Sequence, residues 1–284
     1  MRRIVALFSS VIDQMDFGLT DKVVIVTGAT ANIGRAIALD FAAEGAKVVA
    51  VGRDEEAARR LVSVAAERGG SSILFVQADM LDPASAPLVL ERAEDLGPVA
   101  VLVNNVGGGA GVGLFVSSEP RTWQADIDRS LMTTLRMTHA VLPGMIARQW
   151  GRIINIGSMA GLGGQYAMST YSAAKGAVHS FTQALAREVG EHNITVNCVA
   201  PHGTVSSDPA AFSTGSNFHP EFGRRRAVET QFTPEQNAKR RRNGVLPRYI
   251  AQPEEISAAV LWLASTRGAY VTGQIVPIDG GARL

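Results

Sequence analysis

Short apolar runs rich in β-branched residues recur along the chain, and stretches with a helical period of apolar positions separate them. Several runs are apolar at nearly every position, which is typical of parallel strands buried on both faces. The predicted strands are Val23–Thr27, Lys47–Val51, Ile73–Gln77, Val99–Val103, residues 152–156, Ile194–Val199 and Gln274–Ile278. The predicted helices are residues 33–45, residues 54–68, a segment that opens at Asp82-Pro83, residues 120–148, the segment around Tyr171 and one after Pro253. This alternation, with no linker inside it, predicts a single doubly wound α/β domain.

Composition narrows the classes of protein to consider. The chain has 284 residues, of which 46% are hydrophobic, and a formal net charge of +1. Such a balance gives no reason to expect nucleic acid or a membrane surface as a partner, and no apolar run reaches the roughly 18 residues that span a bilayer. The one cysteine, Cys198, excludes an intrachain disulfide framework and fits a reducing compartment, so we expect a cytoplasmic protein. We interpret residues 1–17 as an N-terminal extension or a mis-set start, and residues 18–284 as the domain.

The first predicted strand ends in a turn that contains glycines, and a helix follows at once. The turn reads Gly28-Ala-Thr-Ala-Asn32-Ile33-Gly34. Gly28 permits a tight turn, Gly34 permits close packing, and the free N–H groups of the helix N-terminus attract a pyrophosphate. A plain strand-to-helix connection is the alternative, but the context favours a dinucleotide site.

The end of the second strand bears on the choice of nucleotide. Sites for NAD carry an acidic residue about 20 positions after the glycines, where it binds the ribose 2′-hydroxyl. Gly52 occupies this place and Arg53 follows it, and an arginine suits the 2′-phosphate of NADP. We therefore predict NADP. NAD is the alternative, if Arg53 is only a solvated side chain and Asp54 a helix cap.

Polar residues follow the third and fourth strands, at the edge of the sheet where a ligand would lie. Asp79 comes just after the third strand. Asn104 and Asn105 end the fourth, where they either bind a cofactor or tie neighbouring strands together. A glycine-rich loop then runs from Gly107 to Gly113.

Residues 151–176 contain the candidate catalytic group. Tyr171 and Lys175 lie four positions apart, so they share one face of a helix. An ammonium group beside a phenol favours the phenolate, and we expect Lys175 to lower the pKa of Tyr171. Ser158 follows a predicted strand and could hold a substrate oxygen. A chance pair on a helix surface is the alternative explanation of the spacing.

Residues 201–253 are polar and weakly patterned, which in a compact domain indicates a lid, a binding loop or disorder. We expect a substrate loop at about residues 204–250. Arg224–Arg226 and residues 239–242 are basic clusters that favour an anionic substrate. A solvated helix face or a subunit contact explains them as well.

Together these motifs resemble those of the short-chain dehydrogenase/reductase family, over nearly all of residues 19–284. The resemblance is carried by Thr27, Gly28, Gly34, Asp79, Asn104, Asn105, Gly107, Ser158, Tyr171, Lys175, Pro201 and residues 271–281. It implies a Rossmann fold with a seven-stranded parallel sheet and helices on both faces, a nicotinamide cofactor and commonly a homotetramer. In the family, the match of Tyr171 is the general acid/base, the match of Lys175 binds the nicotinamide ribose and lowers the tyrosine pKa, and the match of Ser158 orients the substrate oxygen.

The resemblance also implies which residues contact the cofactor and the substrate. The cofactor contacts are Gly28, Asn32, Ile33, Gly34, Arg53, Asp79, Met80, Asn105, Gly107, Tyr171, Lys175, Pro201 and Thr204. We expect Gln165, Tyr166 and Met168, which lie between Ser158 and Tyr171, to line the substrate pocket. No metal site is expected.

Three positions depart from the family pattern. Asn32 replaces a glycine, and asparagine tolerates the left-handed conformation better than most residues. Ser130 stands where the family carries the asparagine of a catalytic tetrad, which helps to hold a proton-relay water. Serine is shorter, so the relay is in question. His202 separates Pro201 from Gly203, where it lines the nicotinamide end of the pocket or fills the turn.

The sequence therefore predicts an oxidoreductase that transfers a hydride between NADP(H) and a carbonyl or secondary alcohol, with Tyr171 as general acid/base. A non-redox enzyme on the same scaffold is one alternative, but dehalogenase relatives typically replace the lysine by arginine and lose the nucleotide turn. A cofactor-binding protein with impaired activity, acting through partners, is the other alternative, and only Ser130 favours it.

Overall fold

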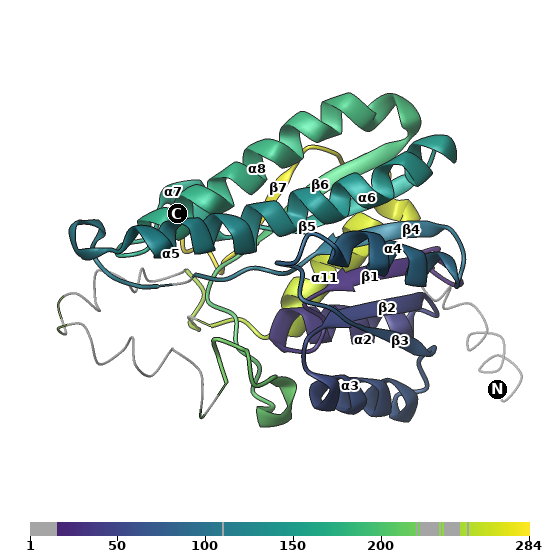
Figure 1. Cartoon of the computed structure of the whole chain (residues 1–284), viewed down its shortest axis with the longest axis horizontal. Coiled ribbons are helices and arrows are strands. Elements are labelled where there is room, and N and C mark those ends of the chain that lie inside the picture. The colour runs from purple at the N-terminus through teal and green to yellow at the C-terminus, as the bar shows by residue number, and fades with distance from the viewer. Residues whose placement is uncertain are drawn as a thin grey trace, which may run out of the picture.

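A seven-stranded, all-parallel sheet forms the centre of the molecule, in a computed structural model that describes residues 16–109, 111–219, 221, 233, 235, 245–248 and 250–284 (Figure 1). The strands are β1 (Val23–Thr27), β2 (Lys47–Gly52), β3 (Ile73–Gln77), β4 (Val99–Asn104), β5 (Gly151–Ile156), β6 (Ile194–Pro201) and β7 (Ile275–Ile278). Their order across the sheet is β3-β2-β1-β4-β5-β6-β7. The predicted fold, with seven parallel strands, is confirmed.

Helices cover both faces of the sheet (Figure 1). One layer contains α2 (Asn32–Ala43), α3 (Glu55–Glu67) and α11 (Pro253–Ala264), and the other contains α4 (Ser85–Glu94), α6 (Thr133–Ala147) and α8 (Ser169–Val189). Side chains of β1 alternate between the two cores: Val24 and Val26 pack in the core with α2, and Val23 and Ile25 pack in the core with α4 and α6. This double burial is the reason why the strands are apolar at nearly every position.

The helix boundaries differ from the predictions at two places. The segment predicted as one helix over residues 120–148 consists of α5 (Pro120–Ile127), a π-helical turn (Asp128–Met132) and α6. The helix predicted to open at Asp82-Pro83 begins instead at Ser85, because the Asp82 carboxylate accepts the N–H of Ala84 in a preceding turn.

Several short elements also occur in the described part of the chain. A helix that the sequence analysis did not predict, α7 (Met159–Gly163), lies between β5 and α8. The 3-10 turns are Phe115–Ser117, Pro209–Ala211, Gly190–His192 and Thr266–Gly268.

Some predictions fall on residues outside the described ranges. These are the basic clusters at 224–226 and 239–242, and all but the last two residues of the segment 1–17. Within the described ranges, no helix has both the length and the apolar character needed to cross a bilayer.

The strand order places the ligand-binding edge of the sheet. From β1 the chain builds outward through β2 and β3, then returns to β4 on the other side of β1. In open α/β sheets, ligands bind beyond the carboxyl ends of the strands at such a reversal. The ends of β1 and β4 are therefore the place to look for a site.

Candidate active site

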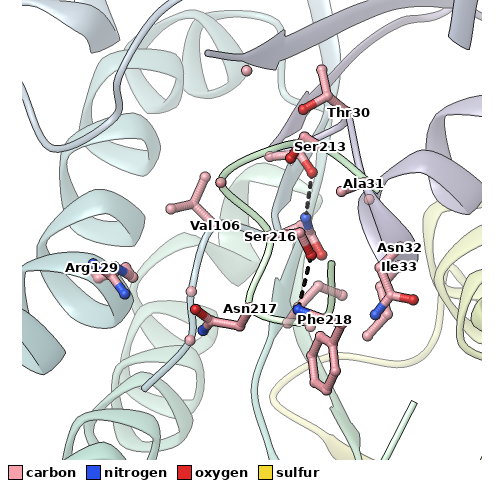
Figure 2. A pocket seen from close by; sticks show the side chains of 18 of the residues that line it. Thr30, Ala31, Asn32, Ile33, Val106, Arg129, Ser213, Ser216, Asn217 and Phe218 are labelled. Atoms are coloured by element: carbon pink, nitrogen blue, oxygen red, sulfur yellow. Dashed lines mark hydrogen bonds between the residues drawn. The ribbon is translucent and has the colours of Figure 1, made fainter. Parts of the chain in front are cut away.

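A cavity of about 770 Å³ lies at the carboxyl ends of the strands, where the strand order reverses. Most of the predicted site residues line it. They are Gly28, Asn32, Ile33, Gly34, Arg53, Asp79, Met80, Asn105, Gly107, Ser158, Tyr171, Lys175, Pro201, His202 and Thr204. Figure 2 shows part of this lining, with the Thr30–Ile33 turn on one side and Arg129 on the other.

The turn after β1 is built for close backbone contact. Gly28 has a φ of +64°, which is strained for residues with a side chain. A methyl group on Gly34 would lie 2.1 Å from the carbonyl oxygen of Gly28. The turn leads into the N-terminus of α2, whose first turn carries no acidic residue that would repel an anion. The turn, the helix end and the adjoining cavity fit a dinucleotide.

Asn32 adopts the conformation expected of the glycine that it replaces. Its φ is +46°, in the left-handed region. Its side chain is buried: Nδ2 donates to the carbonyl oxygen of Thr204 at 3.0 Å, and Oδ1 accepts the N–H of Ser206 at 2.9 Å. The asparagine thus joins the nucleotide turn to the start of the loop after β6, which a glycine could not do.

The two asparagines that end β4 tie neighbouring strands together. Asn104 Nδ2 donates to Asn155 Oδ1 at 2.9 Å and to Thr138 Oγ1 at 3.0 Å. Asn105 Nδ2 donates to the carbonyl oxygens of Thr27 at 2.9 Å and Gly28 at 3.1 Å. Of the two alternatives left open by the sequence, this geometry supports strand tying, and Asn105 also borders the cavity.

Arg53 and Asp54 follow β2 at one end of the cavity. The Arg53 side chain is 59% exposed, and its Nη1 lies 3.5 Å from Oδ2 of Asp79. Asp54 caps α3, because its Oδ1 accepts the N–H of Ala57 at 3.0 Å. Arg53 is therefore largely solvated, as the alternative interpretation held, and also lines the cavity.

Ser158, Tyr171 and Lys175 meet at the other end of the cavity. A hydrogen bond joins the side chains of Ser158 and Tyr171. Ser158 begins α7, where its Oγ also accepts the N–H of Ala160 at 3.1 Å. Lys175 is 3% exposed, and its Nζ donates to the carbonyl oxygen of Ile156 at 2.6 Å. The strand β5 and the helix α8 thus bring together the three residues that the sequence separates.

Burial shifts the pKa values of this group away from the charged forms. It raises the pKa of Tyr171, although the hydrogen bond from Ser158 acts in the opposite direction. Burial lowers the pKa of Lys175 to about 8. The expected lowering of the Tyr171 pKa by Lys175 is therefore wrong for this structure: desolvation of the phenolate is the largest effect, and the Lys175 amine donates to a backbone carbonyl instead.

Ser130 lies outside the cavity lining, in the π-helical turn between α5 and α6. Its side chain is 0% exposed, and among the described residues its hydroxyl has no hydrogen-bond partner. An asparagine amide would reach farther from this backbone position than the hydroxyl does. Within the described residues, the Ser130 hydroxyl is therefore buried and makes no hydrogen bond.

The three residues expected to line the substrate pocket lie beside the cavity rather than on its surface. Gln165, Tyr166 and Met168 belong to the loop between α7 and α8 and are not part of the cavity lining. A methyl group on Gly109 would lie 3.2 Å from Cε of Met168, so this loop packs against the loop after β4.

The sequence analysis missed several residues around the catalytic group. Asp126 of α5 is 1% exposed, accepts a hydrogen bond from Thr170 at 2.5 Å and contributes to raising the pKa of Tyr171. His179 lies one turn beyond Lys175, and its Nε2 accepts the N–H of Ser158 at 3.4 Å. Burial and the neighbouring Lys175 lower the pKa of His179 to about 4, so the ring is neutral and can accept. The i+4 spacing from Lys175 was the available signal for His179.

The loop after β6 also contributes residues that were not singled out individually. Residues 213–218 line the cavity, at the end where Arg53 and Asp54 lie. No local sequence pattern indicated this contact, because its partners are about 160 positions apart in the chain.

Most of the chain is similar to known oxidoreductases. A family model described as short chain dehydrogenase matches residues 22–213, and one described as enoyl-(acyl carrier protein) reductase matches residues 226–283. The 3-oxoacyl-(acyl-carrier-protein) reductase FabG of Pseudomonas aeruginosa is 35% identical over 266 residues, which cover 93% of this chain and 98% of the relative. The 2,3-dihydroxy-2,3-dihydro-p-cumate dehydrogenase of Pseudomonas putida is 33% identical, with 94% and 96% covered.

A solved structure gives the same answer for the fold. A 7α-hydroxysteroid dehydrogenase, in complex with NADH and 7-oxo glycochenodeoxycholic acid, superposes with a TM-score of 0.79 at 29% identity, covering 94% of this chain and 96% of the other. The family model matches more than half of the chain, and the relatives match nearly all of it. The chain thus belongs to the short-chain dehydrogenase/reductase family, whose members bind a nicotinamide dinucleotide and oxidise or reduce carbinol and carbonyl groups.

Proposed function

We propose that this oxidoreductase transfers a hydride between NADP(H) and a carbonyl or secondary alcohol substrate, with Tyr171 as general acid/base. The observation that carries the proposal is the cluster of Ser158, Tyr171 and Lys175 at one end of a cavity that begins at a dinucleotide turn. Hydride transfer to a carbonyl needs a proton donor at the oxygen and hydrogen bonds that stabilise its developing charge. The cluster supplies both.

NADP rather than NAD is supported by the residues after β2. Gly52 provides no carboxylate for a ribose 2′-hydroxyl, and Asp54 is occupied as the cap of α3. The exposed guanidinium of Arg53 lies at this end of the cavity and can bind a 2′-phosphate with two N–H groups. The relatives do not decide this point, since the similar steroid dehydrogenase was solved with NADH.

The chain's own residues perform the acid–base part of the reaction. A bound nicotinamide supplies or accepts the hydride. In the reducing direction, the Ser158 hydroxyl donates to the substrate oxygen and orients it towards Tyr171, to which Ser158 is already hydrogen-bonded. Burial keeps the Tyr171 phenol protonated at neutral pH, so it can give its proton to the oxygen. With a pKa of about 8, Lys175 is mostly charged at neutral pH, and its ammonium group, which also donates to the carbonyl oxygen of Ile156, can bind the ribose of a nicotinamide nucleotide.

The relatives bound the substrate class. Their names specify a 3-oxoacyl group, a dihydrodiol and a 7-oxo steroid, each with a carbonyl or carbinol carbon. A search for the substrate therefore begins with two kinds of ketone, a 3-oxoacyl compound and a 7-oxo steroid, and with a dihydrodiol as the alcohol.

We also propose a homo-oligomer. Leu114, Phe115 and Val116 are exposed apolar residues beside α5, and burial against a second subunit would remove them from water.

The substitution Tyr171→Phe tests the mechanism. It removes only the hydroxyl, so we expect turnover to fall by about 10²–10⁴-fold, the usual contribution of a positioned acid or base. The affinity for NADPH, measured by fluorescence titration, should change little. Tyr270→Phe is the matched control, because Tyr270 is fully exposed and far along the chain from the cluster. Near-normal turnover of Tyr171→Phe would refute the proposed role.

Ser130, which stands at the position of the family's proton-relay asparagine, has no hydrogen-bond partner among the described residues. This observation favours a second candidate function, a cofactor-binding protein with impaired turnover. The two candidates differ in a simple assay that follows NADPH absorbance with a panel of 3-oxoacyl and 7-oxo steroid ketones. Tight NADPH binding without oxidation across the panel would support the second candidate. Oxidation of NADPH with any of them supports the enzyme.

A further inference from the structure

Residues 205–218, which we call the strap, run from the end of β6 along the border of the cofactor cavity. The strap starts beside α2, where the N–H of Ser206 donates to Asn32 Oδ1 at 2.9 Å. Two residues later, Asp208 lies 3.5 Å from Arg35, whose side chain is only 9% exposed. The first half of the strap is therefore attached to the helix that follows the nucleotide turn.

The second half of the strap is attached to α3 and lines the cavity. Arg60 of α3 donates to the carbonyl oxygen of Phe212 at 3.2 Å, and Phe212 itself is buried. Residues 213–218 then enter the cavity lining, and in Figure 2 Ser213 and Phe218 lie with the Thr30–Ile33 turn around one pocket. At the far end of this stretch, Asn217 approaches the loop after β4: a methyl group on Gly108 would lie 2.9 Å from its Nδ2.

The strap donates hydrogen bonds to Oδ2 of Asp54, the carboxylate oxygen that does not cap α3. Asp54 Oδ1 accepts the N–H of Ala57, and Oδ2 accepts both the N–H of Thr214 at 3.0 Å and the Thr214 hydroxyl at 3.1 Å. This carboxylate is therefore engaged by three protein donors. Both oxygens of Asp54 already accept hydrogen bonds from the protein, so Asp54 is not positioned to bind a ribose hydroxyl. The carboxylate instead fixes the strap next to Arg53.

The next strap residue lies against the guanidinium of Arg53. A methyl group on Gly215 would lie 2.7 Å from Arg53 Nη2, so only a glycine leaves the guanidinium its present place. On its other side, Arg53 Nη1 lies 3.5 Å from Asp79 Oδ2. The guanidinium thus lies between the loop after β3 and the strap, and 59% of the Arg53 side chain is exposed.

We propose that the strap completes the site for the 2′-phosphate of NADP: Gly215 and the Thr214–Asp54 contact hold the Arg53 guanidinium in a position to bind that phosphate. This rests on the proposed function, specifically on NADP as the cofactor. An arginine side chain loses considerable rotamer entropy when it binds, and holding it in place beforehand removes part of that cost. Thr214 and Gly215 are then positioning residues that determine cofactor specificity from a loop about 160 positions away from Arg53.

Binding of adenosine 2′,5′-bisphosphate and of 5′-AMP to the full chain tests the proposal, because the two probes differ only in the 2′-phosphate. We expect Gly215→Ala to weaken the bisphosphate by about tenfold, the effect of one lost charge-assisted hydrogen bond, and to leave 5′-AMP unchanged. Thr214→Val, which keeps the shape but removes the hydroxyl bond to Asp54, should act in the same direction. Calorimetric titration measures both affinities without any turnover.

Gly190→Ala is the matched control for the glycine substitution, because a methyl group there meets no atom within 4 Å. The substitution at Gly215 displaces only the end of a flexible side chain, and Thr214→Val provides an independent variant should Gly215→Ala fail to fold. Wild-type discrimination between the two probes in both strap variants would overturn the proposal while leaving NADP intact. A wild-type protein that binds the two probes equally would refute NADP itself, and the strap proposal with it.

Discussion

Lys175 is buried and Tyr171 is partly buried, and at the scale of single residues this desolvation sets their protonation. Burial disfavours both the tyrosinate and the ammonium, so it raises the pKa of Tyr171 and lowers that of Lys175 to about 8. The result is a proton donor beside a lysine that is still mostly charged at neutral pH. The spacing alone had suggested the opposite shift for the tyrosine, a pKa of Tyr171 lowered by the charge of Lys175.

Replacing Lys175 by methionine should change how the stability of the protein depends on pH. Folding lowers the pKa of Lys175 from 10.5 to about 8, so between these values the unfolded chain binds more protons than the folded one. The contribution of Lys175 to the free energy of unfolding therefore rises across this window, by at most roughly 3 kcal/mol. Lys175→Met lacks this rise. Its stability relative to wild type is thus greatest near neutral pH and declines as pH increases through the window.

Urea unfolding of both proteins over a series of pH values measures this difference. The neighbouring His179 has a pKa of about 4 in the folded protein, below the window. Folding raises the pKa of Cys198 from 9.0 to about 12, so this thiol lowers stability from about pH 9 upward, and it does so in both proteins. Tyr171, whose pKa is raised above 10.0, lowers stability only near the alkaline end and does so in both proteins. Parallel stability curves for the two proteins would show that Lys175 is not desolvated.

The catalytic residues could be predicted because their signal is local. Tyr171 and Lys175 are four positions apart on one helix, and Ser158 follows the end of strand β5 by two residues. Asp126 and Thr214 could not be found in this way, since their contacts with Thr170 and Asp54 span 44 and 160 positions. Only the packed chain brings such pairs together.

At the scale of elements, the strands were predicted to within two residues because burial on both faces leaves a continuous apolar run. The helices were predicted less well. The π-helical turn at Asp128–Met132 is wider than an α-helical turn. The apolar positions before and after it still recur with a helical period, so this pattern does not reveal the turn. Such turns often occur at functional sites, and this one carries Ser130.

The substitution Ser130→Ala tests whether the π-helical turn contributes a polar group to catalysis. The Ser130 hydroxyl is buried and has no partner among the described residues. Removing a buried unpaired hydroxyl is neutral or stabilises the fold, by up to about 1 kcal/mol. We therefore expect an unchanged or slightly higher melting temperature and unchanged turnover, measured by calorimetry and by NADPH oxidation. A clear loss of turnover at constant stability would instead place this hydroxyl in the proton relay.

At the scale of the whole molecule, the sheet joins two halves that meet between β1 and β4. The alternation of strands and helices predicted a doubly wound sheet, but the adjacency of β1 and β4 follows from neither periodicity nor composition. The sequence analysis made no prediction of the strand order, because this order depends on contacts between distant segments. The cavity crosses this junction: its lining includes Gly28 after β1, Arg53 after β2, Gly107 after β4 and Ser158 after β5. A ligand bound there contacts both halves.

A dinucleotide that spans both halves should stabilise the domain as one unit. At an NADPH concentration 100 times its dissociation constant, linkage stabilises the folded protein by about 2.7 kcal/mol. For a chain of this size, this raises the melting temperature by roughly 5–10 °C in a single transition.

Gly34→Ala should abolish the shift, because the new methyl group would lie 2.1 Å from the Gly28 carbonyl oxygen, and a backbone atom cannot easily move aside. The melting temperature of Gly34→Ala without NADPH shows whether the variant is folded, and Gly190→Ala controls for the glycine-to-alanine change. A folded Gly34→Ala protein that keeps the full shift would mean that the turn after β1 does not bind the cofactor. Two separate transitions would mean that the halves do not respond together.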